Sequence, residues 1–547
     1  MHFWKFILSF LIVKIFWIKA IKLRELTVNT SSGCVQGFYL QSFNNEFIGF
    51  EGIPFAEPPI GNLRFKEPEP IRPWNSTFIA NKTIACIHLD MPTNEILGQE
   101  DCLVINIYTP KFIYNDQLLN TIVHIHGGLW LYEAGYYYRP DLLLQHNVVY
   151  VTFNYRLGAL GFLSTENEIV SGNNGLKDQV LALQWLQINI EKFGGNPKSI
   201  TLTGWSAGAA SVTLHYLSQK SVALFNRGIA LSGTCLSSQY LTYKPLDKAK
   251  QLAARLDCPS DCVFNMVICL RNRPAKRIVE EQTLGIDPNY AVTFFGAVVE
   301  NASNPNAFLI KSPWDILVLQ DDIVQDLPLI FENVRDEGLN PTVTYLTQPE
   351  YFEKINTNWT NLAPIILCYN DTIEVERWQC LAEDIRDKYL GGQPISNLNY
   401  QYYQKILTDR IYLVPMQESA TRFAQKLNIS VYYNIMTYRG EFSTTNELAN
   451  NRINYGVCHG DDLQYILPRL LVNHSFSSNF RAMSRIFVDM WLQFANDSTV
   501  KIGNLKAPPF KQDYNAVFNF VEIASPFYQT IKVTETLANY FDFCYEH

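Results

Sequence analysis

A serine held in a tight turn is the residue of this chain best suited to nucleophilic chemistry. Residues 199–208 read SITLTGWSAG, so a short strand rich in β-branched residues runs into the pattern G-x-S-x-G, and small residues follow at 209–211. A serine between two glycines on a strand-to-helix turn has strained backbone angles and an accessible hydroxyl, because larger neighbours would clash there. Ser206 is therefore the predicted nucleophile. The alternative is a surface serine on an ordinary tight turn.

A serine nucleophile needs a base, and with this type of turn the base is a histidine well downstream of the serine. Of the later histidines, His215 lies only nine residues on, His474 lies inside a glycosylation sequon and His547 ends the chain. His459 is left, in a glycine-flanked loop that reads YGVCHGDD at 455–462. Such a loop can direct an imidazole at a neighbouring strand end, so His459 is the predicted base. The alternative is a loop histidine without a partner.

The oxyanion of an acyl-transfer intermediate must be held by backbone N–H groups. Residues 121–130 read TIVHIHGGLW, a buried strand followed by a His-Gly-Gly turn. This pattern predicts that Gly128 and Leu129 are donors, and that Ala207 at the start of its helix is the third. The alternative is an ordinary pair of glycines in a loop after a strand. Chemistry of this kind needs no metal and no cofactor.

The catalytic acid cannot be chosen from the residues alone, because many carboxylates lie between Ser206 and His459. Over nearly its whole length, however, the chain resembles the carboxylesterase type-B family, the cholinesterase-like branch of the α/β-hydrolases, and its insect-type members in particular. The motifs that carry the resemblance are those at 52–59, 64–65, 100–103 with 106, 154–158, 172–179 and 193–197, together with the G-x-S-x-G turn at 204–208, a pattern called a nucleophile elbow.

The resemblance implies a role for each residue of a Ser-His-Glu triad. The family's acid falls on Glu337, with Asp336 as the fallback, its base on His459 and its nucleophile on Ser206. It also suggests that Ser232 helps to hold the acid, although a buried structural serine explains Ser232 equally well. The implied function is a serine carboxylesterase that cleaves small-molecule carboxylic esters through an acyl-serine intermediate.

Two positions depart from the family pattern. Leu129 stands where glycine or alanine is common, and Trp205 stands where Glu, Gln or His commonly precedes the nucleophile. A leucine beside the oxyanion hole narrows the acyl space, so small acyl groups or slow turnover are expected. Three alternatives stay open: a catalytically silent adhesion or binding protein of the same fold, a lipase and, among esterases, an enzyme of the juvenile hormone esterase type.

The expected fold class is α/β, an α/β-hydrolase fold with a large, mostly parallel central sheet and helices on both faces. Apolar runs at 121–125 and 148–153 predict strands buried on both faces, as parallel strands are. The periodicity of 178–193 predicts an amphipathic helix that stops at Gly194 and Gly195. No linker or repeat interrupts the chain, so residues 21–547 are expected to form a single catalytic domain after a signal peptide at 1–20.

The composition limits the partners. A net charge of −8 over 547 residues argues against nucleic acid or an anionic membrane surface as a partner, whereas a neutral ester is compatible with it. The apolar run near the N-terminus is too short to span a membrane, so no stable membrane anchor is expected. The oligomeric state stays open.

Sequons and cysteines indicate a secreted, extracellular glycoprotein. The family places disulfides at Cys86 with Cys102 and at Cys258 with Cys269. Cys262 could take the place of Cys269 in the second disulfide. Cys368 and Cys380 are a possible third pair, and Cys458 is the candidate for a free thiol. Residues 87–101 contain no tryptophan, unlike the corresponding loop of cholinesterases, which argues against a cholinesterase. The nine sequons are at Asn29, Asn75, Asn81, Asn301, Asn358, Asn370, Asn428, Asn473 and Asn496.

Overall fold

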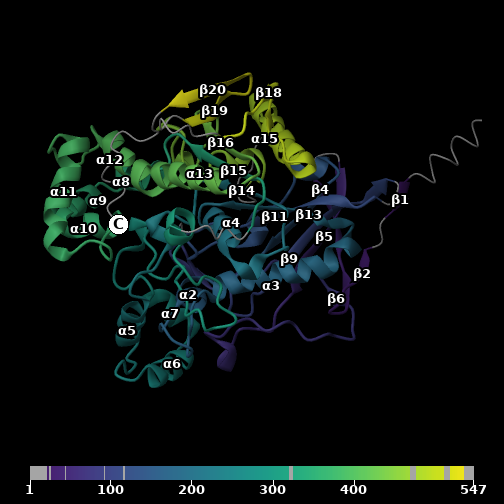
Figure 1. The fold of residues 1–547 in the computed structure, drawn as a ribbon, viewed down its shortest axis with the longest axis horizontal. Coiled ribbons are helices and arrows are strands. Elements are labelled where there is room, and N and C mark those ends of the chain that lie inside the picture. Colours follow the sequence, from purple (N-terminus) through teal and green to yellow (C-terminus); the bar gives the residue numbers. More distant parts are fainter. Residues whose placement is uncertain are drawn as a thin grey trace, which may run out of the picture.

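An 11-stranded sheet organises the chain (Figure 1). The computed structural model describes residues 21–534 except 24–25, 43–44, 92, 115–116, 320–324, 469–475 and 511–517. The predicted signal peptide at 1–20 and the sequon at Asn473 lie outside the described residues. In spatial order the strands are β20 (Tyr528–Thr534), β19 (Phe518–Ser525), β16 (Val431–Met436), β15 (Leu329–Val334), β14 (Arg227–Leu231), β13 (Gly195–Trp205), β11 (Leu119–Ile125), β12 (Val149–Phe153), β9 (Val104–Pro110), β5 (Asn45–Pro54) and β4 (Phe38–Ser42).

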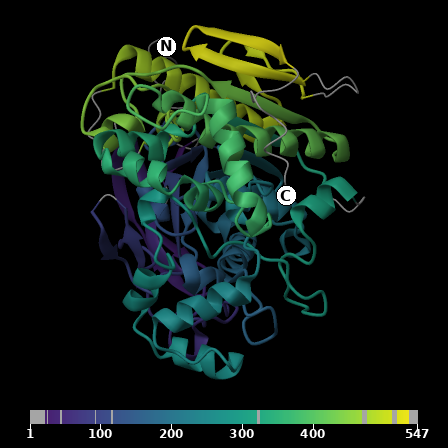
Figure 2. The ribbon, with the colours of Figure 1, turned by 90° about the vertical axis from the view of Figure 1, so that its left-hand side faces the viewer.

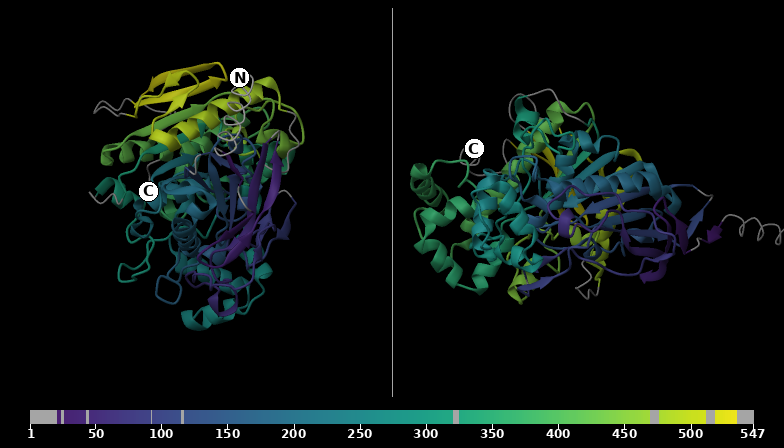
Figure 3. Two further views of the ribbon diagram at one scale, coloured as in Figure 1. Left: turned by 90° about the vertical axis from the view of Figure 1, so that its right-hand side faces the viewer. Right: turned by 90° about the horizontal axis from the view of Figure 1, so that it is seen from below.

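The sheet is parallel through its centre. All neighbours from β12 to β19 pair in parallel, and only the two margins, β12 to β4 and β19 to β20, are antiparallel. Figures 2 and 3 show the β19–β20 hairpin at the outer edge of the molecule. Because parallel strands all point the same way, their carboxyl ends lie along one edge of the sheet, where α/β folds place their sites.

Helices cover both faces of this sheet, and β11 shows why. Its consecutive residues Ile122 and Val123 are fully buried in two different apolar clusters, since neighbouring side chains of a strand point to opposite faces. The cluster around Val123 contains the packed faces of α3 and α4, and that around Ile122 contains the packed face of α15. The expected α/β-hydrolase architecture is confirmed.

The remaining elements are helices and short strand pairs. Helices α8 to α12 share an apolar core of their own and group at one end of the molecule (Figures 1 and 3). The helices are α2 (Gly158–Phe162), α3 (Asn174–Asn189), α4 (Ala207–Leu217), α5 (Pro245–Arg255), α6 (Val263–Arg271), α7 (Ala275–Glu281), α8 (Leu339–Thr347), α9 (Glu350–Thr357), α10 (Trp359–Ile366), α11 (Val375–Leu390), α12 (Tyr400–Leu407), α13 (Val414–Lys426), α14 (Thr444–Ala449) and α15 (Ser478–Asp497). The short strands are β1 (Ile21–Leu23) with β10 (Phe112–Tyr114), β2 (Thr27–Asn29) with β3 (Cys34–Gln36) and β6 (Phe78–Ile79), β7 (His88–Asp90) with β8 (Glu95–Leu97), and β17 (Lys501–Ile502) with β18 (Leu505–Lys506).

The helix expected at 178–193 begins four residues earlier, as α3, and is buried around most of its circumference rather than amphipathic. Its first turns carry Asp178, which is fully buried and receives a bidentate ion pair from Arg156 at 2.6 and 2.8 Å. Sequence periodicity reads such a charge as exposed, so it misplaced the start of the helix. The glycine stop is confirmed, because Gly194 takes φ +87° directly after the last helical turn.

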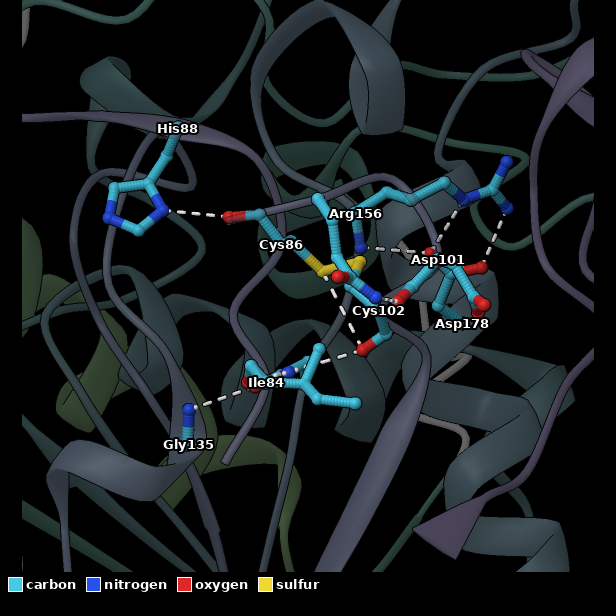
Figure 4. The surroundings of a disulfide bond; sticks show 10 residues. Ile84, Cys86, His88, Asp101, Cys102, Gly135, Arg156 and Asp178 are labelled. Carbon is cyan, nitrogen blue, oxygen red and sulfur yellow. Dashed lines mark hydrogen bonds and ion pairs between the residues drawn. A yellow bond between two sulfur atoms is a disulfide. The ribbon is translucent and has the colours of Figure 1, made fainter. Parts of the chain in front are cut away.

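One disulfide joins Cys86 to Cys102 and closes the loop between them (Figure 4). The Asn154 side-chain amide donates to the carbonyls of Ile84 and Cys102, at 2.7 and 3.1 Å. Its oxygen accepts from the backbone of Gly135 at 3.0 Å. The disulfide loop and the segment after β11 are therefore held by the same asparagine.

A second disulfide joins Cys258 to Cys269, and Cys262 is a free, exposed thiol. The expected pair of Cys368 with Cys380 is wrong, because both thiols are free. Cys380 lies on the exposed side of α11, whereas burial raises the pKa of Cys368 to about 12 on a side chain near Arg410. Cys458 is free and buried.

Candidate active site

The strand-to-helix turn around Ser206 has the geometry of a nucleophile elbow. Ser206 lies between β13 and α4 with φ +57° and ψ −121°, a strained conformation for a residue other than glycine. A Cβ atom on Gly204 would lie 2.2 Å from the carbonyl oxygen of Gly208, and one on Gly208 would lie 2.1 Å from that of Ile125. Both glycines are therefore required by close backbone approach, and the turn directs Ser206 at the carboxyl edge of the sheet.

A buried carboxylate and imidazole lie at the same edge. Glu337 follows β15 by three residues, and its Oε2 lies 2.6 Å from Nδ1 of His459. Glu337 is fully buried and His459 nearly so. The other oxygen, Oε1, accepts from the hydroxyl of Ser232 at 2.6 Å, the amide of Asn333 at 3.0 Å and the backbone of Val334 at 3.0 Å. The carboxylate is thus fixed by three donors on one side and by the imidazole on the other.

The neighbouring acid, Asp336, has a different contact. Its carboxylate accepts from the backbone N–H of Val457 at 2.9 Å, and its own N–H donates to the carbonyl of Val457 at 3.0 Å. Asp336 therefore holds the loop that carries His459 through its backbone, and its carboxylate also forms an ion pair with Arg335 at 2.9 Å. Of the two candidate acids, Glu337 is the one that contacts the imidazole.

Ser206 and His459 line the same cavity, whose volume is only about 60 Å³. The Ser206 hydroxyl lies 3.3 Å from that of Tyr240, and among the described residues no hydrogen bond joins Ser206 to His459. Catalytic hydrogen bonds often tighten only when substrate binds. Residues of α8, α10 and α12 form part of the cavity wall, namely Asn340, Pro341, Ile366 and Leu407.

The turn after β11 passes beside the nucleophile. A Cβ atom on Gly127 would lie 3.1 Å from Cβ of Ser206, and one on Gly128 would lie 2.3 Å from the carbonyl oxygen of Tyr132. Gly128 and Leu129 both have positive φ and line the cavity. Within the described residues, the N–H groups of Gly128, Leu129 and Ala207 donate to no backbone carbonyl. They are therefore available to an anion in the cavity.

Two aromatic rings flank the imidazole. The ring centroids of Trp205 and Tyr412 lie 4.8 and 4.9 Å from that of His459. Tyr412, which lines the cavity, and Tyr240, which contacts the Ser206 hydroxyl, were not singled out in the sequence, and neither has a local signature, since each reaches the site from a distant segment. Ser232 was suggested by family resemblance, and the structure places it on the carboxylate of Glu337.

This arrangement of elbow, buried Glu-His pair and glycine turn has known counterparts. The model of the "Carboxylesterase family" matches residues 24–535. The chain belongs to the carboxylesterase family. It is accordingly an ester hydrolase, as the family resemblance predicted.

Curated relatives and a solved structure agree with this assignment. The chain is 36% identical to "Carboxylic ester hydrolase" of Bombus ignitus, over 92% of this chain and 91% of that protein. It is 36% identical to "Esterase FE4" of Myzus persicae, over 93% and 90%. It also resembles the crystal structure of juvenile hormone esterase from Manduca sexta with OTFP covalently attached, with a TM-score of 0.80 and 26% identity over 93% of this chain and 96% of that one.

A second pair of buried carboxyls lies near the Glu337–His459 pair of this carboxylesterase. Glu332 in β15 and Asp462 at the end of the histidine loop are fully buried, and among the described residues Oε1 of Glu332 and Oδ2 of Asp462 have no hydrogen-bond partner. Burial and the neighbouring carboxylate Asp462 raise the pKa of Glu332, while burial and the charge of Glu337 raise the pKa of Asp462. The fold therefore favours their protonated forms.

This pair predicts that stability declines as the pH rises. A carboxyl whose pKa is raised on folding binds protons more tightly in the folded chain than in the unfolded chain. The free energy of unfolding therefore decreases as the pH rises from the ordinary pKa of the group to its raised pKa. Asp462→Asn removes one titratable carboxyl. The amide oxygen can still accept the hydrogen bond that the backbone N–H of Leu463 donates to the Asp462 carboxylate at 2.9 Å. We expect the variant to melt about 2 °C or more above the wild type at about pH 8, with a smaller difference at about pH 6. An equal difference at both pH values would contradict a raised pKa of Asp462 in the folded chain.

Leu129 predicts a limit on acyl size. It lines the cavity that contains Ser206 and His459 with φ +55°, a conformation that costs a leucine about 1–3 kcal/mol and that glycine adopts freely. Leu129→Gly keeps the backbone N–H and removes a side chain from the cavity wall. We expect the ratio of kcat/KM for p-nitrophenyl butyrate over acetate to rise by about tenfold. An unchanged ratio would mean that the leucine side chain does not limit the acyl group.

Most of the sequons that the structure describes lie where glycosylation is sterically possible. Seven of the nine asparagines are exposed, namely Asn29, Asn75, Asn81, Asn301, Asn358, Asn428 and Asn496. Asn370 is partly buried.

None of the helices in the described part of the chain has the length and apolar character of a membrane span.

Proposed function

We propose that this ester hydrolase is a serine carboxylesterase that works through an acyl-Ser206 intermediate. The observation that carries the proposal is the buried contact of 2.6 Å between Glu337 and His459, in the wall of the same cavity that holds the elbow serine. A carboxylate, an imidazole and a strained serine in this order are the parts of a charge-stabilised nucleophile. The roles are therefore nucleophile for Ser206, base for His459 and orienting acid for Glu337.

The acylation step uses the free nitrogen of the imidazole. Because Nδ1 of His459 faces Glu337, Nε2 is left to take the proton of the Ser206 hydroxyl. The serine oxygen then forms a bond to the ester carbonyl carbon, and the carbonyl oxygen becomes negatively charged. The N–H groups of Gly128, Leu129 and Ala207 stabilise that charge. Collapse breaks the bond to the alcohol oxygen, which receives the proton from His459.

Deacylation repeats these steps with water in place of the serine hydroxyl. His459 takes a proton from water, whose oxygen forms a bond to the acyl carbon, and a second oxyanion forms on the same N–H groups. The bond between the acyl carbon and the Ser206 oxygen then breaks, and His459 returns the proton to that oxygen. The products are one carboxylic acid and one alcohol. No step calls for a metal or a cofactor.

The test is steady-state and pre-steady-state hydrolysis of p-nitrophenyl acetate by the full chain. We expect a burst of p-nitrophenol of about one equivalent per enzyme, followed by slower turnover, because acylation and deacylation are separate steps. Absence of both burst and turnover, on a folded protein, would contradict the proposal and favour a silent binding protein.

We also propose that the chain is secreted as a glycoprotein, with residues 1–20 as its signal and 21–547 as one catalytic domain. Two disulfides and the exposure of most sequons support this proposal. Expression in insect cells should deliver the protein to the medium, with a mobility increase after enzymatic removal of N-linked glycans. Retention inside the cells without such an increase would contradict it.

A further inference from the structure

A second cavity lies on the other side of Trp205 from the catalytic cavity. Its volume is about 350 Å³, against about 60 Å³ for the catalytic one. Ligand pockets in proteins measure about 300–1,000 Å³, so the second cavity falls within that range and the catalytic cavity lies below it. The catalytic cavity as it stands therefore leaves little space for a long acyl chain.

Trp205 is the boundary between the two spaces. Among the residues that the structure describes, it alone lines both cavities. Its ring packs on the imidazole of His459 at 4.8 Å, and Gly460 in the wall of the second cavity lies against its edge, where a Cβ atom would be 2.8 Å from Cζ2. A larger residue at 460 would push the ring toward the base.

The second cavity has the lining that a flexible apolar chain requires. Phe442, Leu463 and Leu467 join Trp205 as its apolar wall, and polar residues that include the charged Glu447 and Arg452 lie around them. Apolar walls with a few polar groups are typical of sites for small organic ligands. An apolar acyl chain needs no charged partner in such a cavity, so a neutral ester is the favoured substrate.

We propose that Trp205 is a specificity-determining partition, and that the second cavity is the subsite for a medium-length acyl chain that reaches it when the ring of Trp205 is displaced. The inference rests on the proposed acyl-Ser206 function. Short acyl groups fit beside the ring, while longer ones occupy the space lined by Phe442, Leu463 and Leu467. Trp205, a departure from the family pattern, thus acquires a role beside the base.

The experiment compares p-nitrophenyl octanoate with p-nitrophenyl acetate as the ratio of their kcat/KM values. Glu447→Trp places a large ring at the wall of the second cavity, and Glu441→Trp, an exposed position of the same segment outside both cavities, is the matched control for charge and size. We expect Glu447→Trp to lower the octanoate-to-acetate ratio by about tenfold and Glu441→Trp to change it by less than about twofold.

Opening the partition should act in the opposite direction. Trp205→Leu keeps an apolar side chain beside His459 and should raise the ratio by about tenfold, because the two cavities then connect. The same shift from both glutamate variants, or no shift from Glu447→Trp, would overturn the inference. If the wild type hydrolyses neither ester, the proposed function fails instead, so the two failures are distinguishable.

Discussion

Replacing Ser206 with alanine is expected to lower kcat for p-nitrophenyl acetate by about 10⁴-fold or more. The hydroxyl is the only group of the proposed triad that forms a bond with the substrate. What remains is the stabilisation of the transition state by the N–H groups of Gly128, Leu129 and Ala207, which accounts for residual hydrolysis. Steady-state kinetics with the release of p-nitrophenol as readout measures this loss.

The matched control is Ser238→Ala. The hydroxyl of Ser238 is buried and has no hydrogen-bond partner among the described residues, so its removal should leave both kcat and the melting temperature close to those of the wild type. If Ser206→Ala retained more than about a tenth of the wild-type kcat, an acyl-serine at this position would be contradicted.

Glu337→Gln is expected to lower kcat by about 10³- to 10⁴-fold. The amide keeps the size of the carboxylate but loses its charge, and the imidazolium that forms during catalysis then has no counter-ion at 2.6 Å. The amide also offers an N–H to Nδ1 of His459, which favours the wrong tautomer. The same substitution should leave KM nearly unchanged, because Glu337 is fully buried behind His459.

The neighbouring residue provides the control for Glu337. Asp336→Asn removes a charge one position away, but the Asp336 side chain contacts the backbone of Val457 and not the imidazole. We therefore expect a decrease of kcat below about tenfold. Equal losses from the two variants would show that loop position, and not the charge beside the imidazole, sets the rate.

Much of the fold could be predicted from local patterns. The apolar runs at 121–125 and 148–153 are the buried parallel neighbours β11 and β12. The elbow could be located because its glycines are required by contacts within a few residues or with the adjacent strand. These features depend on short-range geometry, which the sequence pattern records directly.

The acid could not be identified in this way. Glu337 meets His459 across 122 positions of the chain, and nothing local separates it from Asp336. Family resemblance was needed for that choice, and the structure then separates the two carboxylates by their contacts. Tyr240 and Tyr412 were missed for the same reason, since a tyrosine beside the nucleophile or the imidazole has the same local sequence as one in the core.

Buried charge was the other obstacle. Asp178 stands in a segment whose periodicity treats it as exposed, yet it is fully buried and paired with Arg156. The pairing of Cys368 with Cys380 failed because the number of leftover cysteines says nothing about burial: Cys380 is exposed on α11, whereas Cys368 is largely buried between α10 and α11.

The acyl-enzyme itself provides the most direct test. The full chain would be mixed with p-nitrophenyl acetate, quenched in acid during the burst, and analysed by intact-mass and peptide mass spectrometry. We predict the added mass of one acetyl group, located on the peptide that contains Ser206 and absent from the Ser206→Ala variant. An acetyl group on another residue, or turnover without any acylated protein, would contradict the mechanism.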